Sequence, residues 1–248
     1  MNCEILRRYE KYPTIPTMKK IVTTFLAVTA TAFAHEHNLF DGKTLDGWEG
    51  LAGKWTVEDG AITGQTTKEN PATGNTFLVW KGGEVDDFEL TFQYKFSGEN
   101  EKSYGNSGVQ YRSKLVDEKN FVIAGYQADF EIGPKWSGIL YEEKGRGILA
   151  KRGEKVVIHQ TEDANKPRIE VVGETNKSDE IQAAIKPLEW NTYKIVAQGN
   201  RLQHFINGKL SVDITDNTKE GAKKGLLALQ LHAGPPMKVQ FKDIVMKD

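Results

Sequence analysis

The chain has 248 residues, of which 38% are hydrophobic and 27% charged, with a formal net charge of −1. That composition is ordinary for a soluble protein and leaves enough apolar residues to bury a core. Because the net charge is near zero and no basic stripe offsets it, nucleic acid and acidic membrane surfaces are excluded as partners attracted by charge.

A targeting segment is predicted at residues 18–34, which open with Met18 and two lysines, continue with an apolar run and close on Ala32-Phe33-Ala34. The apolar run is too short to span a bilayer as a finished helix. Cleavage after Ala34 would export residues 35–248 to the periplasm or the medium with no membrane span. Residues 1–17 are interpreted as an upstream extension, because a complete signal peptide begins at Met18.

The cysteine content supports the same division of the chain. The only cysteine, Cys3, falls in the upstream extension. The exported domain is therefore predicted to have no disulfide, no cysteine nucleophile and no thiolate metal site, and to be stable through packing alone.

Short alternating segments separated by glycine-containing turns make up the rest of the chain. Trp55–Ile62 predicts a hairpin that turns at Asp59-Gly60. Phe88–Phe96 places five apolar residues on one face and polar residues on the other, which is typical of a half-buried antiparallel strand. Further strands are predicted at Thr76–Trp80, in two runs within Lys155–Val172, and at Trp190–Gly199, Arg201–Asn207, Leu210–Ile214, Gly225–His232 and Lys238–Met246.

One short helix is predicted at Asp179–Lys186, capped by Ser178 and stopped by Pro187. Many short strands and a single small helix predict an all-β fold. We expect one antiparallel two-sheet sandwich of the jelly-roll type over residues 35–248.

The middle of the chain, residues 106–147, carries the side chains with the most chemistry. Period-two alternation predicts that Gln110 and Arg112 share one face of a strand. On the next strand Gln127 and Asp129 share a face, with aromatic residues and alanine turned to the core. Together these side chains are predicted to form a polar floor.

Several motifs along the chain resemble one family in their order and spacing. They are Leu39–Trp48, Asn106–Arg112, Gly125–Asp129, Glu189–Asn191, Ile206–Gly208 and Leu229–His232. On these residues the chain resembles the 3-keto-disaccharide hydrolase domain family over nearly all of residues 35–248. The resemblance implies a concanavalin A-like jelly roll with a ligand in the concave face of one sheet, and activity on glycosides oxidised to a ketone at C3. Many members have Gly-Tyr-Glu where this chain has Gln127, so an acid–base role at that position would have to move to a neighbour.

Asp129 is the first candidate for general acid or base. A conventional glycosidase needs two facing carboxylates, and Glu131, Glu142 or Glu143 can supply the second. The alternative is that Asp129 pairs with a nearby arginine as a polar brace under the sheet.

His232 is the second catalytic candidate. It lies at the end of a predicted strand and shares a face with Gln230, while Leu229 and Leu231 turn to the core. Histidine as a residue type exchanges protons near neutral pH, which suits a general base. The alternative is a strand-end histidine bonded to the backbone.

Side chains that hold the substrate are predicted around these two residues. Arg112 and Arg146 can bind sugar hydroxyls or an oxyanion, and Arg146 lies between two glycines in a predicted loop. Trp136 and Tyr141 can stack on a pyranose, although packing within a loop explains them equally well. The predicted substrate-binding residues are Gln110, Arg112, Gln127, Trp136, Tyr141, Glu142, Arg146 and Gln230.

The implied ketone suggests an elimination route. Asp129 or His232 removes the acidified hydrogen on C2, Arg112 or Arg146 stabilises the enolate, the C1 substituent leaves, and water adds. A divalent metal ion can polarise the ketone, but no His or Asp cluster has a diagnostic metal-binding spacing. Two alternatives stay open: a non-catalytic carbohydrate-binding module on the same fold, and a conventional glycoside hydrolase of unoxidised glycans.

Overall fold

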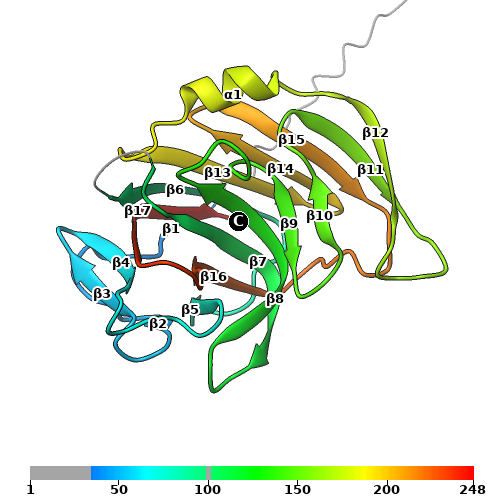
Figure 1. The fold of residues 1–248 in the computed structure, drawn as a ribbon. Helices are drawn as coiled ribbons and strands as arrows, with labels where there is room; N and C mark the ends of the chain where they lie inside the picture. The colour runs from blue at the N-terminus through cyan, green and yellow to red at the C-terminus, as the bar shows by residue number, and fades with distance from the viewer. Residues whose placement is uncertain (1–34, 99–101) are drawn as a thin grey trace, which may run out of the picture. The chain divides into compact units, whose positions relative to one another are not determined.

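The computed structural model describes residues 35–98 and 102–248 (Figure 1). The predicted upstream extension, the signal peptide and the fate of Cys3 lie outside the described residues. Among the described residues, no helix is long and apolar enough to cross a lipid bilayer.

The described chain folds into two β-sheets with one helix, which confirms the predicted sandwich. The larger sheet has ten strands in the order β12 (Arg168–Glu174), β11 (Glu154–His159), β15 (Lys209–Asp216), β14 (Arg201–Ile206), β13 (Asn191–Gln198), β6 (Phe88–Ser97), β17 (Met237–Lys247), β4 (Ala61–Thr66) and β3 (Trp55–Glu58), with β1 (Glu36–Asn38) paired to β17. The smaller sheet has seven strands in the order β10 (Gly147–Ala150), β9 (Leu140–Glu143), β8 (Val122–Glu131), β7 (Asn106–Asp117), β16 (Leu226–Leu231), β5 (Thr76–Trp80) and β2 (Trp48–Glu49). The strand pairs are antiparallel, apart from the parallel pair β11 and β15.

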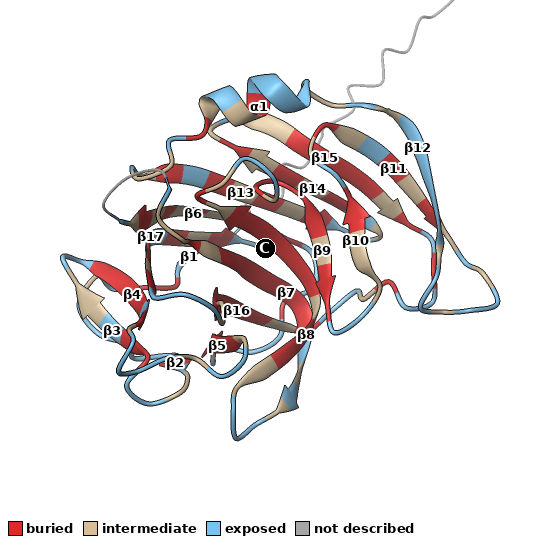
Figure 2. Ribbon diagram, viewed as in Figure 1, coloured by how far each residue is buried: buried red, intermediate tan, exposed pale blue. Residues whose placement is uncertain are grey.

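The core lies between the two sheets (Figure 2). The alternation predicted for β6 is confirmed, because Phe88, Leu90, Phe92, Tyr94 and Phe96 are all buried. Aromatic rings from both sheets stack in this layer. One face of each sheet is therefore packed in the core and stabilises the fold.

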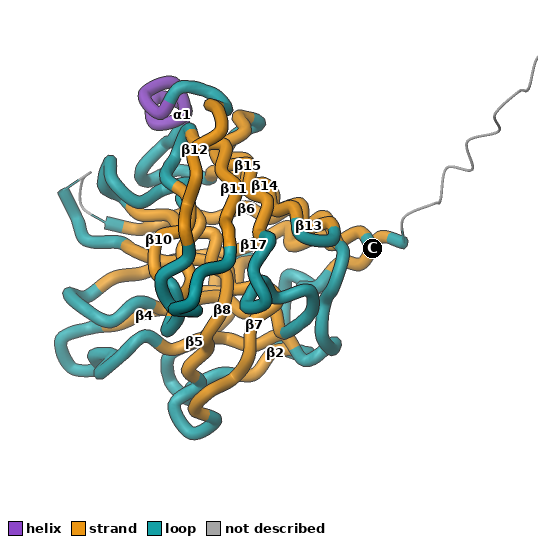
Figure 3. Tube along the Cα trace, turned by 90° about the vertical axis from the view of Figure 1, so that its right-hand side faces the viewer, coloured by secondary structure: helices purple, strands orange, loops and turns teal. Residues whose placement is uncertain are grey.

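The predicted position of the helix is confirmed, but the predicted capping residue is wrong. Helix α1 runs from Ser178 to Ala184 at one end of the larger sheet, beside β15 (Figure 3). Its N-cap residue is Lys177, without a side-chain capping bond, so Ser178 is inside the helix and does not cap it. The helix is held by Ile181, which is fully buried.

Strands β9 and β10 differ from the sequence-based expectation, which places a loop around Arg146 that folds over the site. The segment is a hairpin that extends the smaller sheet; Lys144 in its turn has φ +55°, and Gly147, the first residue of β10, has φ +76°. Left-handed backbone at these residues allows the chain to reverse tightly.

A second apolar cluster covers part of the outer face of the smaller sheet. Phe77 and Val79 of β5 and Ala228 of β16 lie on the face opposite to the main core, under the tip of the β7–β8 hairpin, which supplies Ile123. The remainder of the outer face includes β8 and β9, where Gln127 and Asp129 point away from the core.

Candidate functional site

A cavity of about 220 Å³, here called the site cavity, lies on the uncovered half of that outer face. Its lining residues are Asn75, Asn106, Gln127, Asp129, Trp136, Ile139, Tyr141, Glu143, Ile148 and His232. Strand register explains the grouping, since Gln127 pairs with Tyr141 and Gly125 with Glu143, and paired residues share a face. The expected meeting of Asp129, His232, Gln127, Trp136 and Tyr141 at one hollow is what the structure shows.

Asp129 is an almost enclosed carboxyl group in this cavity. It is 7% exposed, and Gln127 Nε2 donates a hydrogen bond to its Oδ1 at 3.0 Å. Burial raises the pKa of Asp129 well above its ordinary value, and the nearby carboxylates of Glu131 and Glu143 raise it further, against the opposing bond from Gln127. The protonated form is therefore favoured, as a general acid requires.

Three buried glutamines orient that carboxyl group from behind. Gln230 Nε2 donates to Gln127 Oε1 at 2.9 Å, and the amide of Gln110 lies 2.9 Å from the same oxygen. Because Gln127 Oε1 faces these two amides, its NH₂ group faces Asp129. Gln110 and Gln230 are fully enclosed, so they position the site from beneath and do not line its cavity.

His232 lines the cavity, and its two ring nitrogens have different surroundings. Its Nδ1 lies within hydrogen-bond distance of the Ala233 carbonyl oxygen and 2.9 Å from the Tyr104 hydroxyl. A carbonyl oxygen can only accept, so the proton of the neutral ring belongs on Nδ1. Nε2 then carries a lone pair and, within the described chain, has no hydrogen-bond partner, which leaves it available as a base.

The two aromatic residues predicted to stack on a sugar both line the cavity. Trp136 is half-buried, in a loop held by Glu131 Oε1, which accepts hydrogen bonds from the backbone N–H groups of Lys135 and Trp136 at 2.6 and 2.8 Å. The Glu131 carboxylate therefore holds this loop in place. Burial, together with Glu143 and Asp129, raises the pKa of Tyr141, so its hydroxyl stays a hydrogen-bond donor.

The expected position of Arg112 beside Gln110 is wrong. Strand β7 has a bulge after Tyr111, and Arg112 takes φ +48°, which turns its side chain off the polar face. The guanidinium is fully enclosed and donates to the carbonyl oxygens of Asp86 and Gly199 and to the Asp87 carboxylate at 2.7 to 2.8 Å.

Glu142 and Arg146 also lie away from the site cavity. Register places Glu142 opposite Tyr126, on the core side of β9. Arg146 binds Glu142 at 2.7 Å and Asp216 at 2.8 Å, and its guanidinium is 2% exposed. Burial acts to lower the pKa of Arg146, but the combined hydrogen bonds and charge of Glu142 and Asp216 hold it above its ordinary value. Glu142, Arg146 and Arg112 line a second cavity of about 410 Å³, and Glu143 lines both cavities.

Three polar residues that line the site cavity, Asn75, Asn106 and Glu143, are not among the predicted catalytic and substrate-binding residues. In the sequence Glu143 is one of three possible second carboxylates, and the available signal was its spacing of two from Tyr141, which places both on the face of β9 that meets Gln127 and Gly125. Asn75 and Asn106 stand immediately before or at the start of β5 and β7, where no periodicity distinguishes them. Their polar groups complete the rim.

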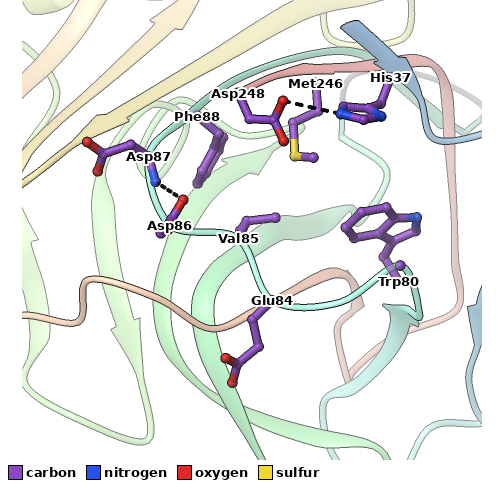
Figure 4. Close-up of a pocket in the computed structure, with 10 residues that line it drawn as sticks. His37, Trp80, Glu84, Val85, Asp86, Asp87, Phe88, Met246 and Asp248 are labelled. Carbon is purple, nitrogen blue, oxygen red and sulfur yellow. Dashed lines mark hydrogen bonds and ion pairs between the residues drawn. The ribbon is translucent and has the colours of Figure 1, made fainter. Parts of the chain in front are cut away.

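No cluster of three or more His, Cys, Asp or Glu side chains in the described residues is arranged to hold a metal ion. A separate hollow of about 260 Å³ lies between β1, the segment after β5 and the end of β17 (Figure 4). Trp80 and Val85 face His37 across it, and His37 pairs with Asp248 at 3.2 Å. It shares no lining residue with the site cavity.

Comparison with known proteins agrees with the fold. The family model of the 3-keto-alpha-glucoside-1,2-lyase-like domain matches residues 36–247. The chain belongs to this family. A 3-keto-disaccharide hydrolase of Bacteroides thetaiotaomicron is 34% identical over an alignment of 93 positions, which covers 33% of this chain and 29% of that protein. The chain thus aligns with under a third of that relative's length.

Solved structures share the architecture at low identity. A candidate glycosyl hydrolase from Parabacteroides distasonis superposes with a TM-score of 0.54 at 20% identity, covering 86% of this chain and 93% of that one. A carbohydrate-binding module, CBM66, from Bacillus subtilis gives 0.51 at 15% identity over 82% and 96%. At these identities the matches show the fold alone.

Proposed function

We propose that this family member is an exported enzyme that cleaves 3-keto-glycosides, with the site cavity as its active site. The observation that supports it most is that one cavity holds both an acid and a base. Burial favours the protonated form of the Asp129 carboxyl group, and His232 Nε2 is free to accept a proton. An acid and a base whose environments differ are what elimination beside a ketone requires. The name of the B. thetaiotaomicron relative supports the substrate class.

In the proposed reaction the C3 ketone acidifies the hydrogen on C2, and His232 Nε2 removes it. The Tyr141 hydroxyl and the Asn106 amide are neutral donors at the cavity for the enolate oxygen. Asp129 gives its proton to the leaving oxygen as the bond from C1 breaks. Water then adds at C1, giving one proton back to Asp129, while His232, whose abstracted proton exchanges with solvent during the intermediate, delivers a solvent-derived proton to C2. The net change is hydrolysis, and both residues end as they began.

Deuterium labelling tests this route directly. The protein is incubated with a 3-keto-disaccharide in D₂O, with the unoxidised disaccharide and an enzyme-free sample as controls, each with and without chelator. Elimination followed by hydration predicts deuterium at C2 of the released keto-sugar and no cleavage of the unoxidised parent. Asp129→Asn and His232→Gln should each lower kcat by about 10²- to 10⁴-fold. Cleavage without deuterium at C2 would exclude the elimination route.

Two other functions give different results in the same assay. A carbohydrate-binding module, suggested by the CBM66 fold match, predicts binding of sugar without turnover of either substrate. A conventional glycosidase predicts cleavage of the unoxidised disaccharide that depends on two carboxylates. Asp129 and Glu143 line the same cavity and are the pair to substitute in that case.

A further inference from the structure

Asn75 connects the two sides of the site cavity. It is the last residue before β5, and its side chain reaches both β9 and the end of β16. Its Nδ2 donates to Glu143 Oε2 at 3.3 Å, and its Oδ1 accepts from the backbone N–H of Ala233 at 3.0 Å. One short amide thus touches a carboxylate on one wall and the residue after His232 on the other.

We infer that Asn75 is a positioning residue of the active site, which orients the Glu143 carboxylate and fixes the His232 imidazole through Ala233; this rests on the function proposed above. The contact to Glu143 engages Oε2 and leaves Oε1 for a substrate hydroxyl. Glu143 is 7% exposed, and the hydrogen bond from Asn75 is what fixes the direction of its carboxylate as an acceptor.

The second contact acts on His232. The carbonyl oxygen of Ala233 accepts from Nδ1, and this bond keeps the proton off Nε2. The N–H of the same residue is bound to Asn75, so Asn75 holds Ala233 in the position from which it selects the tautomer. The next residue is Gly234, whose φ of +143° is a conformation that glycine adopts easily. The bond from Asn75 therefore restrains Ala233 beside a flexible position in the backbone.

The segment that carries Asn75 is itself fixed. Lys54 is 7% exposed, and its ammonium donates to the carbonyl oxygens of Asn70 at 2.9 Å and Pro71 at 2.8 Å, and also to the Asn70 side chain. Three carbonyl oxygens satisfy its three donors and hold the turn that leads into β5. Asn75 therefore lies between the turn that Lys54 holds and the paired strand β5, so its own position is fixed, as a positioning residue requires.

Two substitutions separate the two contacts. Asn75→Asp keeps an oxygen to accept from Ala233 N–H but has no N–H to give to Glu143, whereas Asn75→Ala loses both. We expect kcat/KM on a 3-keto-disaccharide to fall at least tenfold in each. Asn75→Asp also places a carboxylate against Glu143, so the acid limb of its pH–rate profile should move to higher pH. Asn217→Ala is the matched control, since it removes a surface Asn–Asn bond outside the cavity.

The His232 tautomer is read without substrate, from the ¹⁵N shifts of the imidazole in the free protein, with His232→Gln identifying the signals. Protonation at Nδ1 is expected in the wild type, in Asn75→Asp and in Asn217→Ala, with a mixed tautomer in Asn75→Ala. An Asn75→Ala protein with wild-type tautomer and wild-type kcat/KM would overturn the inference. If the wild type cleaves no 3-keto-glycoside, the proposed function fails, while the tautomer measurement still decides whether Asn75 positions His232.

Discussion

Replacing Asp129 by Asn should make the protein more stable while it loses activity. The carboxyl group is 7% exposed and lies near Glu131 and Glu143, so its charged form is strongly disfavoured in the fold. In the unfolded chain the same group ionises with the ordinary aspartate pKa of 3.8. Asn has nearly the same shape, can accept the same bond from Gln127, and never ionises.

The magnitude follows from proton linkage. Between pH 3.8 and the raised folded pKa, the folded wild type binds one more proton than the unfolded chain, so its free energy of unfolding falls by up to about 1.4 kcal/mol per pH unit. Asp129→Asn lacks this dependence. The advantage of the variant should therefore be near zero at pH 3.5 and grow as the pH rises, by about 3–6 °C in Tm for each unit.

The assay is thermal unfolding of wild type and variant at matched pH values from 3.5 to 8, with kcat measured on the same samples. Asp46→Asn makes the same chemical change at an exposed side chain and should leave the stability difference flat. A difference for Asp129→Asn that stays constant with pH would refute the burial argument. Wild-type kcat in a stabilised variant would refute the catalytic one.

Three further predictions concern groups outside the site cavity. Burial lowers the pKa of His204 to about 3 from 6.5, so the free energy of unfolding should fall by up to about 1.4 kcal/mol per unit as the pH drops from 6.5 toward 3, and His204→Gln should abolish that component of acid denaturation curves. The Tyr94 hydroxyl is buried with no hydrogen-bond partner in the described chain, so Tyr94→Phe should raise the free energy of unfolding by about 1 kcal/mol in urea titrations. Arg146→Met leaves Glu142 and Asp216 buried without their cation and should cost about 3–5 kcal/mol, with KM unchanged in the folded fraction; a raised KM at unchanged Tm would return Arg146 to substrate binding.

The sequence was informative wherever a strand is regular over several residues. Strand β8 is the clearest case, since Tyr126 and Phe130 enter the core while Gln127 and Asp129 reach the opposite face, as alternation predicted. Burying one face of a sheet fixes the direction of every second side chain, and a shift by one residue would place polar groups in the core. That constraint is strong enough to be visible in a single sequence.

Alternation gave no strand prediction at the β9–β10 hairpin, for a physical reason. Its strands have four residues each, and the run Leu-Tyr-Glu-Glu offers too few alternations to distinguish a strand from a loop. Glu142 and Glu143 are adjacent and chemically identical, so their roles depend wholly on register with β8. One faces Arg146 on the core side and the other the site cavity.

Arg112 shows most clearly what local sequence leaves out. A non-glycine residue at φ +48° carries a conformational cost of about 1–2 kcal/mol, and nothing in its neighbours along the chain requires it. The offsetting bonds come from Asp86, Asp87 and Gly199, which are 25 to 87 residues away and meet only once both sheets have formed. Three bonds from a buried guanidinium to oxygen atoms exceed that cost, so tertiary contacts select the bulge. The bulge in turn removes the arginine from the polar face and leaves Asp129 without a cationic neighbour there, which is why burial can raise its pKa.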